Sequence, residues 1–193
     1  MSAGLFLGLD VGTQGTKAVL FDVEQRAVVA RASSSYGLIE GLPPGAAEQA
    51  PETWWHAVNT VVRALARTQD LAGVQALGVS GQQHGFVPLD RDMRVIRAAK
   101  LWCDTSTARE AEELSRLFLR PVPTGFTASK ILCLKRHEPA HFARLAHVLL
   151  PHDWINFRLT GELAMEAGDA SGTALFDPAT RRFDAREIGR AHV

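Results

Sequence analysis

Residues 5–22 read LFLGLDVGTQGTKAVLFD, two apolar runs of β type separated by a short polar turn. The first run covers residues 5–9, the second covers residues 16–21, and a third at residues 27–32 follows another short turn. Closely spaced strands joined by tight turns are typical of an antiparallel meander. The stretch therefore predicts a three-strand meander that begins the sheet of this protein.

The rest of the chain is expected to alternate helices with short strands. Pro51 and Pro151 each precede apolar residues that recur with helical periodicity, and proline is favoured in the first turn of a helix. Thr107, with Glu110 three residues later, has the pattern of a capping box. The expected elements are helices that begin at Pro51 and Pro151, the second closed by Gly161, helices at 107–117 and 127–137, strands at 75–80, 86–89, 95–101 and 147–150, and a hairpin at 165–177. This order predicts an α/β fold, a mixed sheet with flanking helices.

The charges of the chain balance, with 21 Lys and Arg against 21 Asp and Glu among 193 residues. A nucleic-acid binder needs clustered cations to neutralise phosphates, so no nucleic-acid partner is expected. Asp10 interrupts the first apolar stretch, so neither a membrane-spanning segment nor a signal peptide is expected. We therefore expect a cytoplasmic protein with no membrane partner.

The spacing of cysteines and histidines indicates neither a disulfide framework nor a metal site. Cys103 and Cys133 lie 30 positions apart without a Cys-x-x-Cys pair, so buried free thiols are expected. His137 and His141 have the spacing of a metal-binding pair on one helix, but Pro139 interrupts the face that they would share. We therefore expect no metal ion at these histidines.

The most informative chemistry follows the first strand, where an acid precedes a turn rich in glycine and hydroxyl groups. Such a turn presents backbone N–H groups and the Thr13 hydroxyl to a phosphate, and the Asp10 carboxylate can hold Mg²⁺ or its water. The order of residues is neither that of a Walker A loop nor Gly-x-Gly-x-x-Gly. An ordinary hairpin, in which Gly12 and Gly15 serve only backbone geometry, is the alternative.

This turn resembles the first phosphate motif of sugar kinases in the actin, hexokinase and Hsp70 superfamily. Further motifs follow in the order expected for the amino-terminal domain of the FGGY carbohydrate kinases, and they are most similar to its bacterial xylulokinase branch. These motifs are AEQAPETWW at 47–55, GVSGQQHG at 78–85, LWCD at 101–104, PHDW at 151–154 and GDASGT at 168–173. The resemblance implies a ribonuclease H-like fold and covers the chain to about residue 180.

The resemblance also implies a role for particular residues. Asp10 would orient Mg²⁺ and phosphate, and the surrounding loop would bind ATP. The loop residues are Gly12, Thr13, Gln14, Thr16 and Lys17. The sugar contacts would be Gln83, His84, Trp102 and Asp104.

The residue chemistry leaves purely structural alternatives to these roles open. The turn at residues 82–85 could be merely polar, Trp102 could be a core residue, Asp104 could be a helix N-cap, and Lys17 could be a solvated side chain. Asp169 and Ser171 match a motif near the cleft, although an Asx turn explains them equally well.

The implied activity is transfer of the ATP γ-phosphoryl group to a pentulose hydroxyl, from D-xylulose to D-xylulose 5-phosphate. In the family, the general-base aspartate and the second, nucleotide-binding domain lie beyond the segment that residues 1–193 match. We therefore expect an amino-terminal domain, truncated before its end, that is inactive alone, with a homodimer as one candidate assembly. Residues 120–125 also replace a longer family segment, which puts a sugar contact from that loop in doubt. A non-catalytic sugar-binding or protein-interaction module is the alternative.

Overall fold

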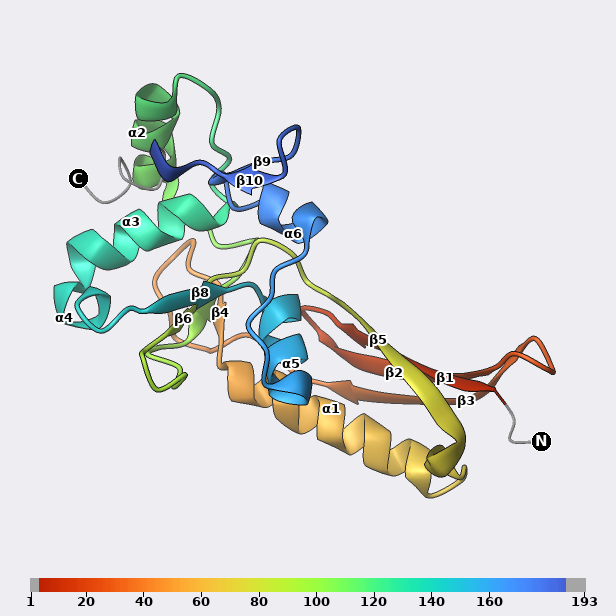
Figure 1. The fold of residues 1–193 in the computed structure, drawn as a ribbon. Coiled ribbons are helices and arrows are strands. Elements are labelled where there is room, and N and C mark those ends of the chain that lie inside the picture. Colours follow the sequence, from red (N-terminus) through yellow and green to blue (C-terminus); the bar gives the residue numbers. More distant parts are fainter. Residues whose placement is uncertain (1–3, 187–193) are drawn as a thin grey trace.

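A four-stranded sheet carries the predicted phosphate turn at one end (Figure 1). The computed structural model describes residues 4–186, and its main sheet has the strand order β3-β2-β1-β5. The strands are β1 (Leu5–Val11), β2 (Gly15–Asp22), β3 (Ala27–Ser35) and β5 (Val74–Gly81). The first three pair antiparallel and β5 pairs parallel to β1. The predicted meander is therefore confirmed.

One face of this sheet is buried against helix α1 (Pro51–Ala66), which lies along it in Figure 1. Leu7, Leu9 and Val11 alternate along β1 with more exposed residues, and all three belong to the main core. Trp54 and Leu65 of α1 are also fully buried in that core. The apolar side chains, which repeat every two residues along the strand and every 3.6 residues along the helix, thus pack in one layer.

The remaining strands of residues 4–186 form three two-stranded sheets, two of which contribute Val87, Leu89, Ala99 and Leu149 to the main core. Strand β4 (Glu48–Gln49) pairs with β7 (Ala99–Lys100), and β6 (Val87–Leu89) pairs with β8 (His147–Leu149). The helical elements are η1 (Leu71–Gly73), α2 (Ala108–Phe118), α3 (Thr127–His137), α4 (Pro139–Phe142), α5 (Pro151–Thr160) and α6 (Ala167–Ser171). A second apolar cluster, which includes Phe86 and Leu114, packs between α2, α3 and their neighbours. The helices predicted at 127–137 and from Pro151 are confirmed.

Two predicted β elements were wrong. The run 95–101 forms strand only at β7, together with a single bridge between Val95 and Leu89. Arg97 interrupts it, because its guanidinium turns to ion pairs with Glu48 and Glu138. The segment 165–177 contains helix α6, whose N-cap Glu166 accepts from a backbone amide, and the hairpin lies later, between β9 (Phe176–Asp177) and β10 (Arg182–Phe183).

Two local predictions also need correction. Thr107 precedes α2 but makes no side-chain cap, because its hydroxyl contacts Ser129 Oγ at 2.9 Å. Glu110 does not complete a capping box, and its carboxylate instead faces His137. Both cysteines are free thiols, but only Cys133 is buried and Cys103 is half-buried. Contacts between elements decided these cases, and no local pattern records them.

The end of α5 offers a direct test of backbone conformation. Gly161 caps this helix with φ 78°, and a Cβ added there would meet no atom within 4 Å. Gly161→Ala should therefore lower the free energy of unfolding by about 1 kcal/mol through backbone strain alone. Urea unfolding measures the change. Gly37→Ala is the control, since this glycine has equal space without a left-handed φ and should shift stability by less than about 0.5 kcal/mol. Equal effects at both positions would contradict the assigned strain.

Candidate functional site

A cavity of about 610 Å³ opens where β1, β2 and β3 meet the predicted phosphate turn. It gathers all of the predicted phosphate-binding residues together with Trp102, which is far away in sequence. The lining residues are Asp10, Gly12, Thr13, Gln14, Gly15, Thr16, Lys17, Ser33, Ser34, Ser35 and Trp102. The serines of β3 were missed by the sequence analysis, and the run of three hydroxyl residues was their available signal.

Hydrogen bonds of Tyr36 stabilise the turn. The Gly12 amide donates to the Gly15 carbonyl at 3.0 Å and closes the turn, and the Tyr36 hydroxyl donates to the Gly12 carbonyl at 2.7 Å. Thr16 is fully buried with its Oγ1 3.2 Å from the Tyr36 hydroxyl oxygen. Burial raises the pKa of Tyr36, which keeps this hydroxyl a donor. Thr16 therefore supports the turn with its side chain.

Asp10 and Lys17 lie directly opposite each other across β1 and β2, and both are exposed. On its other side Asp10 neighbours Ser80 of the parallel strand β5. Mg²⁺ is usually held by one or two carboxylates, waters and substrate phosphates rather than by a complete protein cage. An exposed carboxylate beside a turn with hydroxyl groups fits that donor set.

A hydrogen-bond network of glutamine side chains fixes the position of Thr13. Its hydroxyl donates to Gln82 Oε1 at 3.1 Å and its carbonyl accepts from Gln49 Nε2 at 2.7 Å. Gln82 and Trp54 both donate to Gln49 Oε1, at 3.1 and 2.9 Å. The Trp102 indole Nε1 donates to Thr13 Oγ1 at 3.0 Å, although the two residues are 89 positions apart. Gln49 was missed by the sequence analysis as a supporting residue, because its role depends entirely on this packing.

Gln83 and His84 lie in the turn that follows β5. His84 has a left-handed backbone with φ 58°, which is uncommon for a residue with a side chain. The fully buried Lys130 of α3 donates to the His84 carbonyl at 2.8 Å and also to the Gly125 carbonyl. The His84 ring packs on Phe126 with ring centroids 4.8 Å apart. The start of α3 therefore fixes both the backbone and the ring of His84.

His84 and the Lys130 side chain that contacts it are both shifted toward their neutral forms. Burial, and then the charge of Lys130, lower the pKa of His84. Burial is also the main cause that lowers the pKa of Lys130 to about 7. His84 Nδ1 is buried and has no hydrogen-bond partner within residues 4–186. A neutral imidazole offers one donor and one acceptor, which suits a hydroxyl-bearing ligand.

Asp169 lies near Gln83. Burial raises the pKa of Asp169, while His152 opposes the shift with its Nδ1 3.6 Å from Asp169 Oδ2, and Gln83 slightly lowers the same pKa. His152 also lies 3.3 Å from Asp153 Oδ1, and this contact raises the pKa of the imidazole. Asp169 thus faces the Gln83 turn, whereas the Ser171 hydroxyl donates back to the Gly168 carbonyl within α6.

Asp104 does not line the cavity at all. It is 0% exposed, and its Oδ2 accepts from the Ala47 amide at 2.9 Å and from Lys100 Nζ at 3.2 Å. Its Oδ1 accepts from the backbone amide and the hydroxyl of Ser106. Trp102, by contrast, is 51% exposed. The structure therefore separates the two: Trp102 faces outward and Asp104 fixes the segment beneath it.

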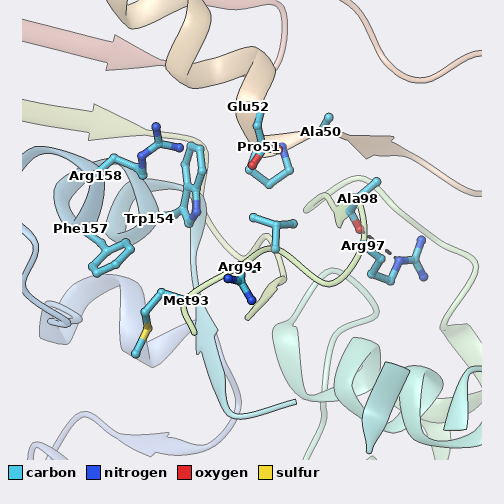
Figure 2. A pocket seen from close by; sticks show the side chains of 11 residues that line it. Ala50, Pro51, Glu52, Met93, Arg94, Arg97, Ala98, Trp154, Phe157 and Arg158 are labelled. Atoms are coloured by element: carbon cyan, nitrogen blue, oxygen red, sulfur yellow. Dashed lines mark hydrogen bonds between the residues drawn. The ribbon is translucent and has the colours of Figure 1, made fainter. Parts of the chain in front are cut away.

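A different cavity, of about 590 Å³, lies at the start of α1 and is lined by residues of α1, α5 and the segment 93–98 (Figure 2). Its cations are already engaged. Arg97 pairs with two glutamates, Arg94 pairs with Asp92, and Arg158 stacks 4.6 Å from the Trp55 ring. Because its polar groups do not converge on the empty space, we assign the functional site to the cavity at the phosphate turn.

Within residues 4–186, the helices are too short or too polar to span a bilayer.

Comparisons with known proteins show which family this chain is similar to. The model of the FGGY family of carbohydrate kinases, N-terminal domain, matches residues 5–189. A xylulose kinase from Escherichia coli (strain K12) is 41% identical over 184 residues, which cover 92% of this chain and 38% of that protein.

Among solved structures, a xylulose kinase from Brucella ovis superposes with a TM-score of 0.90 and 36% identity over 98% of this chain and 41% of its own. A gluconate kinase from Lactobacillus acidophilus gives a TM-score of 0.89 and 26% identity over 100% of this chain and 40% of its own. The chain thus spans 38% to 41% of the length of these relatives. The expected ribonuclease H-like α/β fold, a mixed sheet with flanking helices, is confirmed.

Proposed function

This chain belongs to the FGGY family of carbohydrate kinases, and on that premise we propose that it forms the sugar-binding amino-terminal part of an ATP-dependent kinase for a pentulose. D-xylulose is the first candidate, because the relatives reported above include xylulose kinases. The observation that carries the proposal is the bond from Trp102 to Thr13, because it places one proposed sugar-binding residue in the cavity of the phosphate turn, whose lining does not include Gln83 or His84.

The phosphate side of the proposed site is the turn after β1. The backbone N–H groups of Thr13 and Gln14 would receive the ATP phosphates, and Lys17 would add a positive charge. The Gly12 amide and the Thr13 hydroxyl already donate within the protein. Asp10 would hold Mg²⁺ directly or through water, and the ion would neutralise charge on the transferring phosphoryl group. The Thr16 side chain would support the turn through its hydrogen bond to Tyr36.

The sugar side of the proposed site is built from Gln83, His84 and Trp102. A primary amide and a neutral imidazole provide directional donors and acceptors for hydroxyl and carbonyl groups, and the exposed indole offers a flat face to the C–H edge of a sugar. Asp104 is proposed as a positioning residue for the Trp102 segment, since its carboxylate is buried among protein donors. Asp169 would orient Gln83 in the same way.

Phosphoryl transfer depends on positioning and charge stabilisation in a closed cleft. The proposed cavity lies open at the end of one sheet, so we expect residues 1–193 to bind sugar without efficient transfer. The alternative, a non-catalytic interaction module, draws support from the uncovered face of the sheet, where Phe6 and Phe21 are 38% and 37% exposed.

Isothermal calorimetry of the 193-residue chain tests the proposal. D-xylulose should bind, D-gluconate should bind more weakly, and Mg-ATP is titrated separately. His84→Ala should weaken D-xylulose binding at least about tenfold, because a directional hydrogen bond from the imidazole is lost.

His56→Ala is the matched control, since this histidine is exposed on α1 away from the cavity and should leave the affinity unchanged. A folded chain that shows no sugar heat would contradict the sugar-binding role and favour the interaction module.

A further inference from the structure

Three side chains of metal-binding type converge between α2 and α3, away from the phosphate turn. Glu110 comes from the first turn of α2, and Cys133 and His137 lie four residues apart on α3. Residues at this spacing lie on the same face of a helix. Figure 1 shows α2 and α3 as neighbours, and their packing brings the three ligand atoms within 4.8 Å of one another.

The distances suit a tetrahedral ion. Glu110 Oε1 lies 3.2 Å from His137 Nε2. Zinc binds oxygen and nitrogen at about 2.0–2.1 Å and thiolate sulfur at about 2.3 Å, so ligand atoms in its tetrahedron are about 3.3–3.6 Å apart. The carboxylate and the imidazole, a hydrogen-bonded pair 3.2 Å apart, are close to that separation, and the thiol lies within 4.8 Å of both ligand atoms.

The cluster of Glu110, Cys133 and His137 is accessible to solvent on one side. Glu110 and Cys133 are 4% and 9% exposed, whereas the side chain of His137 is 65% exposed. An ion could therefore enter past His137 and keep a water molecule in its fourth position, while the two inner ligands are shielded from solvent.

The nearby charges favour a cation. Arg97 is paired with Glu48 and Glu138, and Lys100 is paired with Glu48 and with Asp104. The Glu110 carboxylate, by contrast, pairs with His137 and, within residues 4–186, with no Lys or Arg. A divalent ion would neutralise this carboxylate.

The arrangement differs from the familiar two-histidine zinc motif. Residues 137–141 read HEPAH, which has the order His-Glu-x-x-His, and that motif requires both histidines on one helix face. Here α3 ends at His137 and α4 begins at Pro139, and His141 Nδ1 lies 2.7 Å from Glu138 Oε2. Only His137 faces the cluster.

We propose that Glu110, Cys133 and His137 form a binding site for Zn²⁺ that joins α2 to α3. A thiolate, an imidazole and a carboxylate select a borderline ion such as zinc over Mg²⁺. The site is separate from the phosphate turn, so it stands or falls independently of the proposed kinase role.

The test is titration of the chain with Zn²⁺ alone, followed by calorimetry, with Co²⁺ as an optical probe. One ion should bind per chain, and Co²⁺ should show a thiolate charge-transfer band. Cys133→Ala and His137→Ala should each weaken binding at least about tenfold, as expected when a direct ligand is lost.

Cys103→Ala and His141→Ala are the matched controls, a second thiol and a nearby histidine outside the cluster, and both should bind as the unchanged chain does. X-ray absorption of the zinc-loaded, unsubstituted chain avoids any folding defect of the variants and should show one sulfur ligand at about 2.3 Å. Absence of binding, a spectrum without sulfur, or equal loss in the control variants would overturn the proposal.

Discussion

Gly172→Ala is expected to weaken D-xylulose binding on the order of 100-fold. A Cβ at this position would lie 1.7 Å from His84 Nδ1 and 2.0 Å from His84 Cε1. The ring cannot retreat easily, because Phe126 packs on it and Lys130 holds its backbone carbonyl. The added methyl group must therefore displace the imidazole. Calorimetry with D-xylulose measures the loss.

Gly78→Ala provides the control for this prediction. Gly78 lies in β5, the strand that leads into the His84 turn, and a Cβ there meets no atom within 4 Å. Its affinity for D-xylulose should remain that of the unchanged chain. A folded Gly172→Ala chain that binds D-xylulose normally would show that the His84 ring does not contact the sugar.

The second large effect concerns the buried ammonium group of Lys130. Burial lowers its pKa to about 7 in the folded chain, against an ordinary value near 10.5 in the unfolded chain. Between these values the unfolded state binds more protons, so the free energy of unfolding rises with pH. This group alone should add on the order of 3 kcal/mol between pH 7 and pH 9.5. In Lys130→Met that increment is absent.

Urea unfolding of both chains across this pH range measures the difference between their curves. Lys135→Met serves as the control because this lysine lies on the same helix with its ammonium near the Phe142 ring, 5.9 Å from the centroid. Its stability curve should run parallel to that of the unchanged chain. Parallel curves for Lys130→Met as well would contradict a lowered pKa at Lys130.

Local patterns predicted the elements that pack by their own periodicity. The alternation along residues 5–22 predicted β1 and β2, and the helical spacing after Pro51 predicted α1, because in both cases one face must be buried. The phosphate turn was also predicted from local sequence. Its glycines, hydroxyl groups and Asp10 are contiguous in the chain, and contiguous residues stay together in any fold.

Periodicity failed where a distant partner competed with the local pattern. The apolar run 95–101 was predicted as strand, but ion pairs of Arg97 with Glu48 and Glu138 draw it out of the sheet. The box pattern of Thr107 and Glu110 was overridden in the same way, by Ser129 and by His137.

The sequence by itself thus determined the meander, the main helices and the phosphate turn, because these depend on neighbours along the chain. Only the tertiary structure decided that Trp102 bonds to Thr13 and that Asp104 is buried beneath the cavity. It alone brought Glu110 to Cys133 and His137. Such contacts join residues tens of positions apart, and they are fixed by the packing of whole helices and strands, which short-range patterns do not record.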